Sequence, residues 1–200
     1  MEFYRAKQYI VYRLHTELDP RIVYHDLEHT LNVYHAAKEL CKLENVEEHN
    51  TLLLLTAALY HDSGMLIDYE NHEEESVKIC ESILPKFDYS EDDIATIARL
   101  IRKTKRMDKA DCILENIICD ADLDYLGRDY FFIRSTKLHY EWRLMGLHNY
   151  NLVDWLKIQV DFLESHKYYT KSARKIGEKT KRRTAKEIRN LYKICPENKS

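Results

Sequence analysis

The sequence predicts an all-α protein, and three observations support this prediction. Its 200 residues include only four Gly and three Pro, so few residues that end helices or form tight turns are present. Apolar residues recur at intervals of three and four along most of the chain. The composition, 44% hydrophobic and 32% charged, is typical of a folded globular protein. We therefore expect residues 1–200 to form a single domain around one core.

The apolar spacing predicts a bundle of eight or nine helices. The first, 3–18, ends at Asp19-Pro20, because the residue before a proline avoids the helical conformation. The second begins at Tyr24 and continues to about Leu40. The third, 50–60, is apolar on nearly all sides, so we expect it to be buried.

The next two helices carry recognisable start signals. The fourth, 72–84, opens with a run of glutamates, which the helix dipole favours in a first turn. The fifth begins at Ser90, which can form a helix cap together with Asp93. It ends in a cationic cluster at 102–106, which could hold a phosphate or could be a solvated helix end.

The sixth helix, about 112–126, contains three aspartates within an apolar stretch. Buried carboxylates are costly unless they are paired or bind a metal. Asp122 points away from Asp120 and Asp124, because helical neighbours on one face are three or four residues apart. One of the two faces is expected to meet a functional site, and the spacing alone leaves open which one.

The remaining chain predicts three more helices and a loose tail. They cover about 130–142, 153–163 and 168–192, and the last should direct Ile176, Ala185, Ile188 and Leu191 inward. Residues 195–200 are expected to be a loose terminus. Between Lys171 and Lys193 there are ten Lys or Arg but only two Glu. A solvated helix face is the favoured interpretation of this run, and a polyanion-binding face is the alternative.

Charge and cysteine content narrow the class of protein. The net charge of −3 favours neither a nucleic acid nor an anionic membrane as partner. The five cysteines form no Cys-x-x-Cys pair, so we expect reduced thiols and no zinc-thiolate site. Without a signal pattern at Met1–Tyr12 or an apolar run of ~20 residues, we expect a cytoplasmic protein that contacts no membrane.

Histidines and carboxylates occur in two short segments that could share a site. His61-Asp62 closes the apolar third helix, and Gly64 permits the backbone to turn there. His25 and His29 are four residues apart, so they are predicted to share one face of the second helix. Each pattern alone is common among ordinary surface residues. Together they suggest one site, in which His25 and His29 are either two metal ligands or one ligand and one proton donor, because neutral imidazoles and carboxylates bind divalent ions.

The segments 24–29, His61-Asp62 and 120–127, in this order and at these separations, resemble the HD-domain metal-dependent phosphohydrolases. The first looks like the Tyr-His-Asn-x-x-His segment of cyclic-nucleotide phosphodiesterases, with Asp26 in place of Asn. The third looks like the Asp-Ala-Asp-x-x-x-Leu-Gly segment of small bacterial HD proteins. The resemblance implies an HD-type helical bundle with its metal-site core at 24–128 and C-terminal helices at 129–194. It implies the metal ligands His29, His61, Asp62 and Asp122.

The resemblance also implies a reaction. His25 matches the proton donor, and Asp62 would act in catalysis by bridging to a second metal where one is bound. One divalent ion, Mn, Mg, Fe, Co, Ni or Zn, would polarise a phosphoryl oxygen and lower the pKa of its bound water, and the resulting hydroxide would attack phosphorus. Lys105 would neutralise the developing charge. The expected substrate-binding residues are Lys105, Arg102, Glu73 and His72.

Two departures limit this expectation. No histidine lies between His72 and His139, whereas related small HD proteins often place one after a Thr-Lys pair, so we expect a single firmly bound metal. The aromatic purine pocket of phosphodiesterases is not recognisable. We therefore expect an enzyme that cleaves a phosphomonoester or phosphodiester of a nucleotide. The alternative is a metal-binding sensor or interaction module without turnover, whose basic C-terminal helix contacts a partner or polyanion. Oligomeric state stays open.

Overall fold

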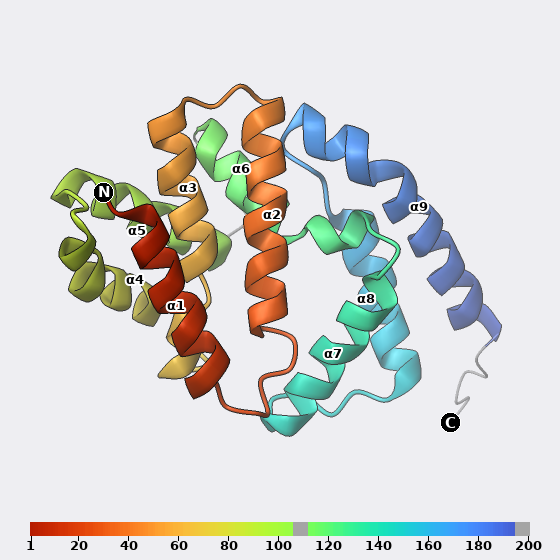
Figure 1. Cartoon of the computed structure of the whole chain (residues 1–200). Helices are drawn as coiled ribbons and strands as arrows, with labels where there is room; N and C mark the ends of the chain where they lie inside the picture. Colours follow the sequence, from red (N-terminus) through yellow and green to blue (C-terminus); the bar gives the residue numbers. More distant parts are fainter. Residues whose placement is uncertain (106–111, 195–200) are drawn as a thin grey trace.

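The structure, a computed structural model, describes residues 1–105 and 112–194 (Figure 1). Within these residues there are nine α-helices, three short 3-10 helices and no strand, which confirms the all-α prediction. The α-helices are α1 (Phe3–Glu17), α2 (Leu27–Leu43), α3 (Glu48–Tyr60), α4 (His72–Ile83), α5 (Glu91–Lys105), α6 (Ile113–Asp122), α7 (Phe131–Leu144), α8 (Leu152–Ser165) and α9 (Lys171–Ile194). The 3-10 helices are η1 (Ser63–Leu66), η2 (Leu84–Phe87) and η3 (Asp124–Gly127).

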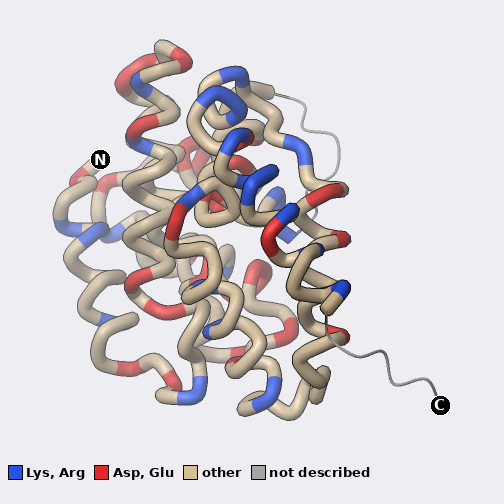
Figure 2. The backbone as a smooth tube through the Cα atoms, turned by 90° about the vertical axis from the view of Figure 1, so that its right-hand side faces the viewer, with Lys and Arg blue, Asp and Glu red and all other residues tan. Residues whose placement is uncertain are grey.

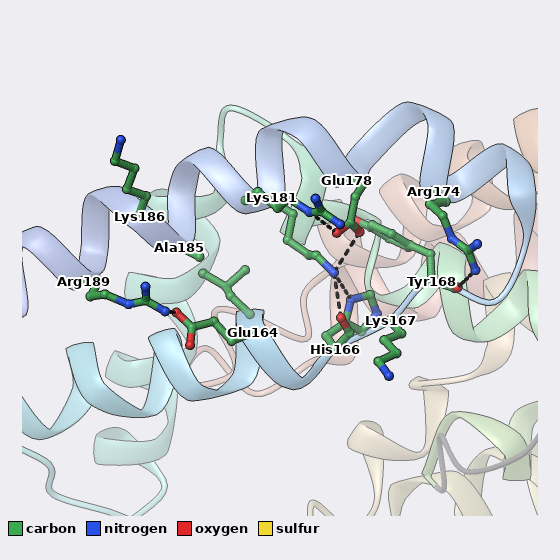
Figure 3. A pocket seen from close by; sticks show the side chains of 12 residues that line it. Glu164, His166, Lys167, Tyr168, Arg174, Glu178, Lys181, Ala185, Lys186 and Arg189 are labelled. Carbon is green, nitrogen blue, oxygen red and sulfur yellow. Dashed lines mark hydrogen bonds and ion pairs between the residues drawn. The ribbon is translucent and has the colours of Figure 1, made fainter.

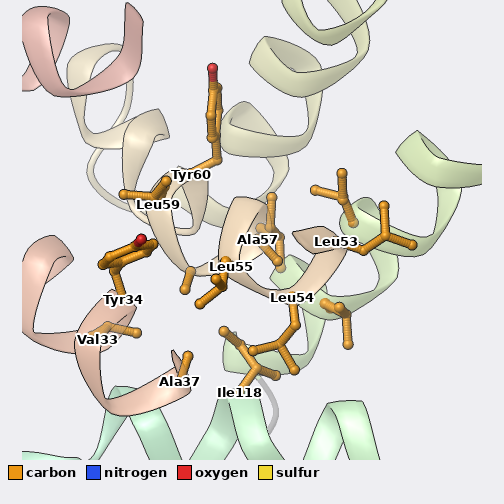
Figure 4. Packing of buried hydrophobic residues seen from close by; sticks show 14 of the residues in the cluster. Val33, Tyr34, Ala37, Leu53, Leu54, Leu55, Ala57, Leu59, Tyr60 and Ile118 are labelled. Carbon is orange, nitrogen blue, oxygen red and sulfur yellow. The ribbon is translucent and has the colours of Figure 1, made fainter. Parts of the chain in front are cut away.

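Helix α3 is the centre of the larger core. All eight residues from Leu53 to Tyr60 are buried, as the apolar sequence predicts. Their side chains pack against α2 and α6, where Val33 and Ile118 are among the contacting residues (Figure 4). The Tyr60 hydroxyl donates a hydrogen bond to the Ala6 carbonyl oxygen at 2.8 Å, which satisfies its polar atom inside the core. Packing and this hydrogen bond hold the C-terminal end of α3 in position, and therefore also His61 and Asp62, which follow it directly.

The last three helices form a second, smaller core with η3. Leu126, Phe131, Leu163 and Ile188 are buried there, on the right in Figure 1. Gly127 faces α9 so closely that a Cβ atom on it would lie 2.4 Å from the Gly177 Cα atom. Glycine is therefore needed at position 127 for η3 to approach α9 this closely, whereas a Cβ atom on Gly177 would lie 2.4 Å from the Tyr168 hydroxyl oxygen.

Several sequence predictions about helix ends can be compared with the structure. The Ser90–Asp93 cap is confirmed, since the Asp93 amide donates to Ser90 Oγ at 3.2 Å. A helix starting at Tyr24 is wrong, because Asp26 caps α2 by accepting from the His29 amide at 2.8 Å. The sixth helix ends at Asp122, and a separate 3-10 turn follows. Leu191, predicted to face inward, is 44% exposed.

Cys41, Cys80 and Cys119 are buried free thiols, and Cys112 is half-buried. Two predicted features, Arg106 in the cationic cluster and the tail from Cys195, lie outside the described residues. None of the described helices is both long and apolar enough to cross a lipid bilayer.

Candidate metal centre

His61 and Asp62 lie directly after α3, at the boundary of the buried core. The His61 Nδ1 atom is 2.9 Å from the carbonyl oxygen of Ala58, so this ring nitrogen donates to the backbone. Its Nε2 atom is then directed at carboxylates, 3.0 Å from Asp62 Oδ2 and 3.5 Å from Asp122 Oδ1. Both His61 and Asp62 are buried. The end of an apolar helix thus delivers two polar side chains to one enclosed point.

Gly64 has a different role from the predicted one. It does not adopt a positive φ. Instead, a Cβ atom there would lie 2.0 Å from the His72 carbonyl oxygen, so glycine is needed for close approach of α4. The Gly64 amide donates to Ser76 Oγ at 2.7 Å, and that hydroxyl donates to the His61 carbonyl at 2.7 Å. These two bonds hold α4 against the turn that contains His61.

Helices α2 and α6 supply the other two candidate ligands. His29 Nε2 lies 3.1 Å from Asp122 Oδ1 and 3.5 Å from Asp62 Oδ2. One ligand atom from each of His29, His61 and Asp122 lies within 4.8 Å of the other two. The spacing along the sixth helix left Asp120 and Asp122 as alternatives, and the structure places Asp122 at this cluster.

Asp120 serves the fold instead. It is buried on the opposite side of α6 and accepts hydrogen bonds from the Tyr169 amide at 2.9 Å, from the Thr170 amide at 2.7 Å and from Thr170 Oγ1 at 2.8 Å. These bonds anchor the segment that leads into α9.

The cluster has the properties of a site for a divalent cation. His61 Nε2 and Asp62 Oδ2 are buried and lie 3.0 Å apart, but they are not aligned for a hydrogen bond, and neither has another hydrogen-bond partner within the described residues. Burial alone would raise the pKa of Asp62, but His61, with smaller contributions from other imidazoles, holds it well below its usual range. An ionised carboxylate and inward-facing imidazole nitrogens are the donor set that metals such as Mn, Fe, Co, Ni and Zn accept.

The two imidazoles respond differently to this environment. Burial lowers the pKa of His29, which favours the neutral form that binds metals. Burial would lower the pKa of His61 as well, but Asp62 and Asp122 raise it far above its usual value. The position between these carboxylates therefore attracts positive charge strongly. A bound divalent cation would supply that charge in place of a proton.

A cavity of about 430 Å³ opens over the cluster. One part of its wall is polar and includes His25, His29, Asp62 and Asp122. The rest is largely apolar and comes from η3, α7 and α8; it includes Tyr125, Leu138, Trp142, Ile158 and Phe162. A cavity of this size and mixed lining suits a small molecule with one charged and one apolar end.

His25 reaches the cavity from the loop before α2, and not from the same helical face as His29. Its position depends on Glu141 of α7, a fully buried residue. Glu141 Oε1 lies 2.5 Å from His25 Nδ1, and Glu141 Oε2 accepts from the Tyr24 amide at 2.6 Å. Tyr69 also donates to Glu141 at 2.7 Å. Burial lowers the pKa of His25, but the bond to Glu141 and nearby carboxylates more than reverse this, so the net shift is upward.

The role of Glu141 could not be predicted from the sequence, because a single glutamate in an aromatic run gives no sign of burial. Tyr24 and His25, which Glu141 contacts, lie more than one hundred residues earlier in the chain. No local spacing in the sequence therefore connects Glu141 with His25. A glutamate between Tyr140 and Trp142 was the only available signal, and it is a weak one.

The four predicted substrate-binding residues are not all brought to the cavity. His72 lines it, with Nε2 3.6 Å from Asp62 Oδ1. Glu73 and Lys105 also line it and pair with each other at 3.1 Å, Lys105 being 43% exposed at the rim. Arg102 is placed elsewhere: it pairs with Glu74 at 3.0 Å and is not among the residues that line the cavity.

The chain is similar in sequence or in fold to several known proteins. The HD domain family matches residues 26–124. An uncharacterized protein of Clostridium beijerinckii is 36% identical over 84 residues; the match covers 40% of this chain and only about half, 53%, of that protein.

Three solved structures share the fold at low sequence identity. A predicted HD superfamily hydrolase from an uncultured Thermotogales bacterium is 19% identical, with a TM-score of 0.62 over 94% of this chain and 90% of that one. Bacillus subtilis YpgQ is 22% identical, with a TM-score of 0.64 over 98% and 99%. YpgQ in complex with ADP is 20% identical, with a TM-score of 0.62 over 98% of each chain. At these identities the likeness concerns the fold alone.

Proposed function

Because the chain belongs to the HD-domain superfamily, we propose that it is a metal-dependent phosphohydrolase acting on a phosphate ester of a nucleotide. The observation that carries the proposal is the convergence of His29, His61, Asp62 and Asp122 at one buried point beneath a cavity. Ligand atoms left without hydrogen-bond partners among the described residues support a resident cation rather than a purely structural network.

In this proposal four side chains hold one divalent ion: His29 and His61 through Nε2, and Asp62 and Asp122 through carboxylate oxygens. When bound, the ion supplies Lewis-acid polarisation of a phosphoryl oxygen and a lowered pKa for water. The second oxygen of Asp62, Oδ1, faces His72 and the cavity, 3.6 Å from His72 Nε2. It is thus placed to accept a hydrogen bond from the attacking water and to orient it.

His25 is the proposed proton donor to the leaving oxygen. Glu141 holds its Nδ1 side, which leaves the Nε2 side for the substrate, and Glu141 is a positioning residue because it acts through His25. Lys105 is the proposed cation for the phosphate. Its ammonium group forms a salt bridge with Glu73 at 3.1 Å. A substrate phosphate would take the place of the Glu73 carboxylate as the partner of Lys105.

A nucleotide is the proposed substrate class for two reasons. The YpgQ structure contains ADP, and YpgQ shares this fold. The apolar part of the cavity, with Trp142 and Phe162, offers a surface for a base or sugar while the phosphate faces the metal ligands. Arg102 is not retained as a substrate-binding residue in the proposal, because it pairs with Glu74 away from the cavity.

The test uses protein stripped of metal by a chelator. Mn, Mg, Co, Ni and Zn are added back singly, and phosphate release is measured with nucleoside mono-, di- and triphosphates and with a generic phosphodiester. We compare His61→Ala with His35→Ala, which removes an exposed histidine of α2 that does not line the cavity. We expect metal-dependent turnover that is lost in His61→Ala and kept in His35→Ala.

Two results would contradict the proposal. Turnover by His61→Ala at the wild-type rate would mean that the assigned ligands are wrong. Stoichiometric metal binding without turnover of any substrate would support the alternative, a metal-binding sensor or interaction module.

A further inference from the structure

The C-terminal part of the chain has a charge that differs from the rest. Residues 164–193 contain eleven Lys or Arg and three Glu, whereas the whole chain carries a net charge of −3. Nearly all of these cations are on α9, which lies along one side of the molecule in Figure 1. Figure 2 looks onto that side, where Lys and Arg recur along the chain. The proposed phosphohydrolase reaction does not involve this surface.

Seven of the α9 cations form one straight row, here called the basic stripe. Its members, at steps of three or four residues, are Lys171, Lys175, Lys179, Arg182, Lys186, Arg189 and Lys193. At 100° per residue they fall within an arc of about 80°, and at 1.5 Å per residue they extend over about 33 Å. All seven are exposed, and the opposite side of α9, including Ala173, Gly177 and Ile188, is buried. The helix is therefore fixed to the protein with its cations outward.

The charges of the basic stripe are mostly uncompensated. Arg182 pairs with Glu178 and Arg189 pairs with Glu164. The other five members form no ion pair within residues 1–105 and 112–194. A solvated helix usually alternates acidic and basic residues at i and i+4, whereas Lys171, Lys175 and Lys179 repel one another at that spacing. Lysines in the first turns also oppose the helix dipole. Repulsion among these lysines destabilises the free protein, and a bound anionic ligand would relieve it.

The groove beside the stripe does not account for these charges. It lies between α8 and α9, has a volume of about 730 Å³, and contains the buried Lys181 (Figure 3). Lys181 Nζ donates to the His166 carbonyl at 2.7 Å and pairs with Glu178 at 3.1 Å. The charge of Lys181 is therefore compensated by groups within the protein. Lys186, Arg182 and Arg189 of the stripe form one edge of the groove, but Lys186 points away from α8 in Figure 3, so its unpaired charge lies at the outer surface of the helix.

We propose that the basic stripe binds the phosphate backbone of double-stranded nucleic acid without reading its sequence. A rigid row about 33 Å long matches about one turn of a duplex. Single strands are usually bound on aromatic platforms, but Tyr192 is the one aromatic residue of α9. A helix that binds membranes inserts an exposed apolar face, whereas the apolar face of α9 is packed on the protein. Contacts to phosphates alone give affinity but no sequence preference.

The test measures fluorescence anisotropy of a labelled 20-base-pair duplex of mixed sequence, in the presence of a chelator. Excluding metal makes the result independent of the proposed phosphohydrolase activity. With about five phosphates neutralised, log K should fall against log salt with a slope of about −4 to −5. The variant K179S/K186S should bind at least tenfold more weakly at 50 mM salt, with a slope shallower by about 2. The matched control K38S/K86S removes two exposed lysines from α2 and η2 and should bind as the wild type does.

Three outcomes would overturn the proposal. The first is no duplex binding at 50 mM salt. The second is equal binding by K179S/K186S and K38S/K86S, which would show that only net charge matters. The third is binding to vesicles containing phosphatidylserine, but not to the duplex, which would assign the stripe to a membrane surface.

Discussion

Asp120 and Asp122 are two residues apart on α6, and replacing each by alanine should affect different properties of the protein: folding stability for Asp120 and metal binding for Asp122. Asp120 accepts hydrogen bonds from two backbone amides and one hydroxyl in the segment before α9. Asp122 contacts His29 at 3.1 Å and takes no part in that segment. We therefore expect Asp120→Ala to lower folding stability and Asp122→Ala to remove the metal.

The size of the first effect follows from the hydrogen bonds. Leaving a buried donor unsatisfied costs about 1–3 kcal/mol, and two of the three donors to Asp120 belong to Thr170, a buried residue. The Ala173 amide still donates to Thr170 Oγ1 in the variant, but the Oγ1 hydrogen and the Tyr169 and Thr170 amides lose their acceptor. We therefore expect a net loss of roughly 3 kcal/mol. For a chain of this length that lowers the melting temperature by about 6–12 °C.

Urea unfolding in the presence of chelator measures stability, and elemental analysis after metal loading measures occupancy. We expect Asp120→Ala to bind metal at wild-type stoichiometry below its melting temperature, and Asp122→Ala to bind at least tenfold more weakly. The reasoning is refuted if Asp120→Ala loses metal while remaining folded, or if Asp122→Ala keeps it.

Three further predictions follow from single contacts. Gly64→Ala should destabilise the chelated protein by about 3 kcal/mol, since its Cβ would lie 2.0 Å from a backbone oxygen; an unchanged melting temperature would contradict the close packing. Glu141→Gln should lower kcat about 10²-fold at unchanged metal content by disordering His25, and unchanged kcat would show that His25 needs no such support. Burial, and to a smaller extent Lys181, lower the pKa of His166 to about 4. The contribution of neutral His166 to folding stability is therefore complete above about pH 6.5 and is lost as the pH falls towards 4. Allowing for partial solvation, we expect a loss of about 1–2 kcal/mol in urea unfolding at pH 4.5 relative to pH 7.5; His166→Gln should abolish that part, and an equal loss in the variant would refute it.

The helical architecture could be predicted from the residues alone, because apolar periodicity and caps are local signals. The buried α3 could be predicted from its apolar residues alone, and the α5 cap from Ser90 and Asp93. The candidate ligands His29, His61 and Asp62 were also recognisable, because their residue types and order form a pattern that needs no coordinates. The start of α2 was predicted wrongly, since His25 fits helical spacing but precedes the cap at Asp26.

Which polar groups act together depends on how the helices pack, and local sequence does not show it. Asp120 and Asp122 are chemically identical in sequence, and they differ only because one side of α6 faces His29 and the other faces Thr170. Glu141 meets His25 because α7 packs beside the loop before α2, a contact between segments more than one hundred residues apart. Local rules describe neighbours within one helical turn, whereas burial and charge pairing depend on what distant segments bring to the same point.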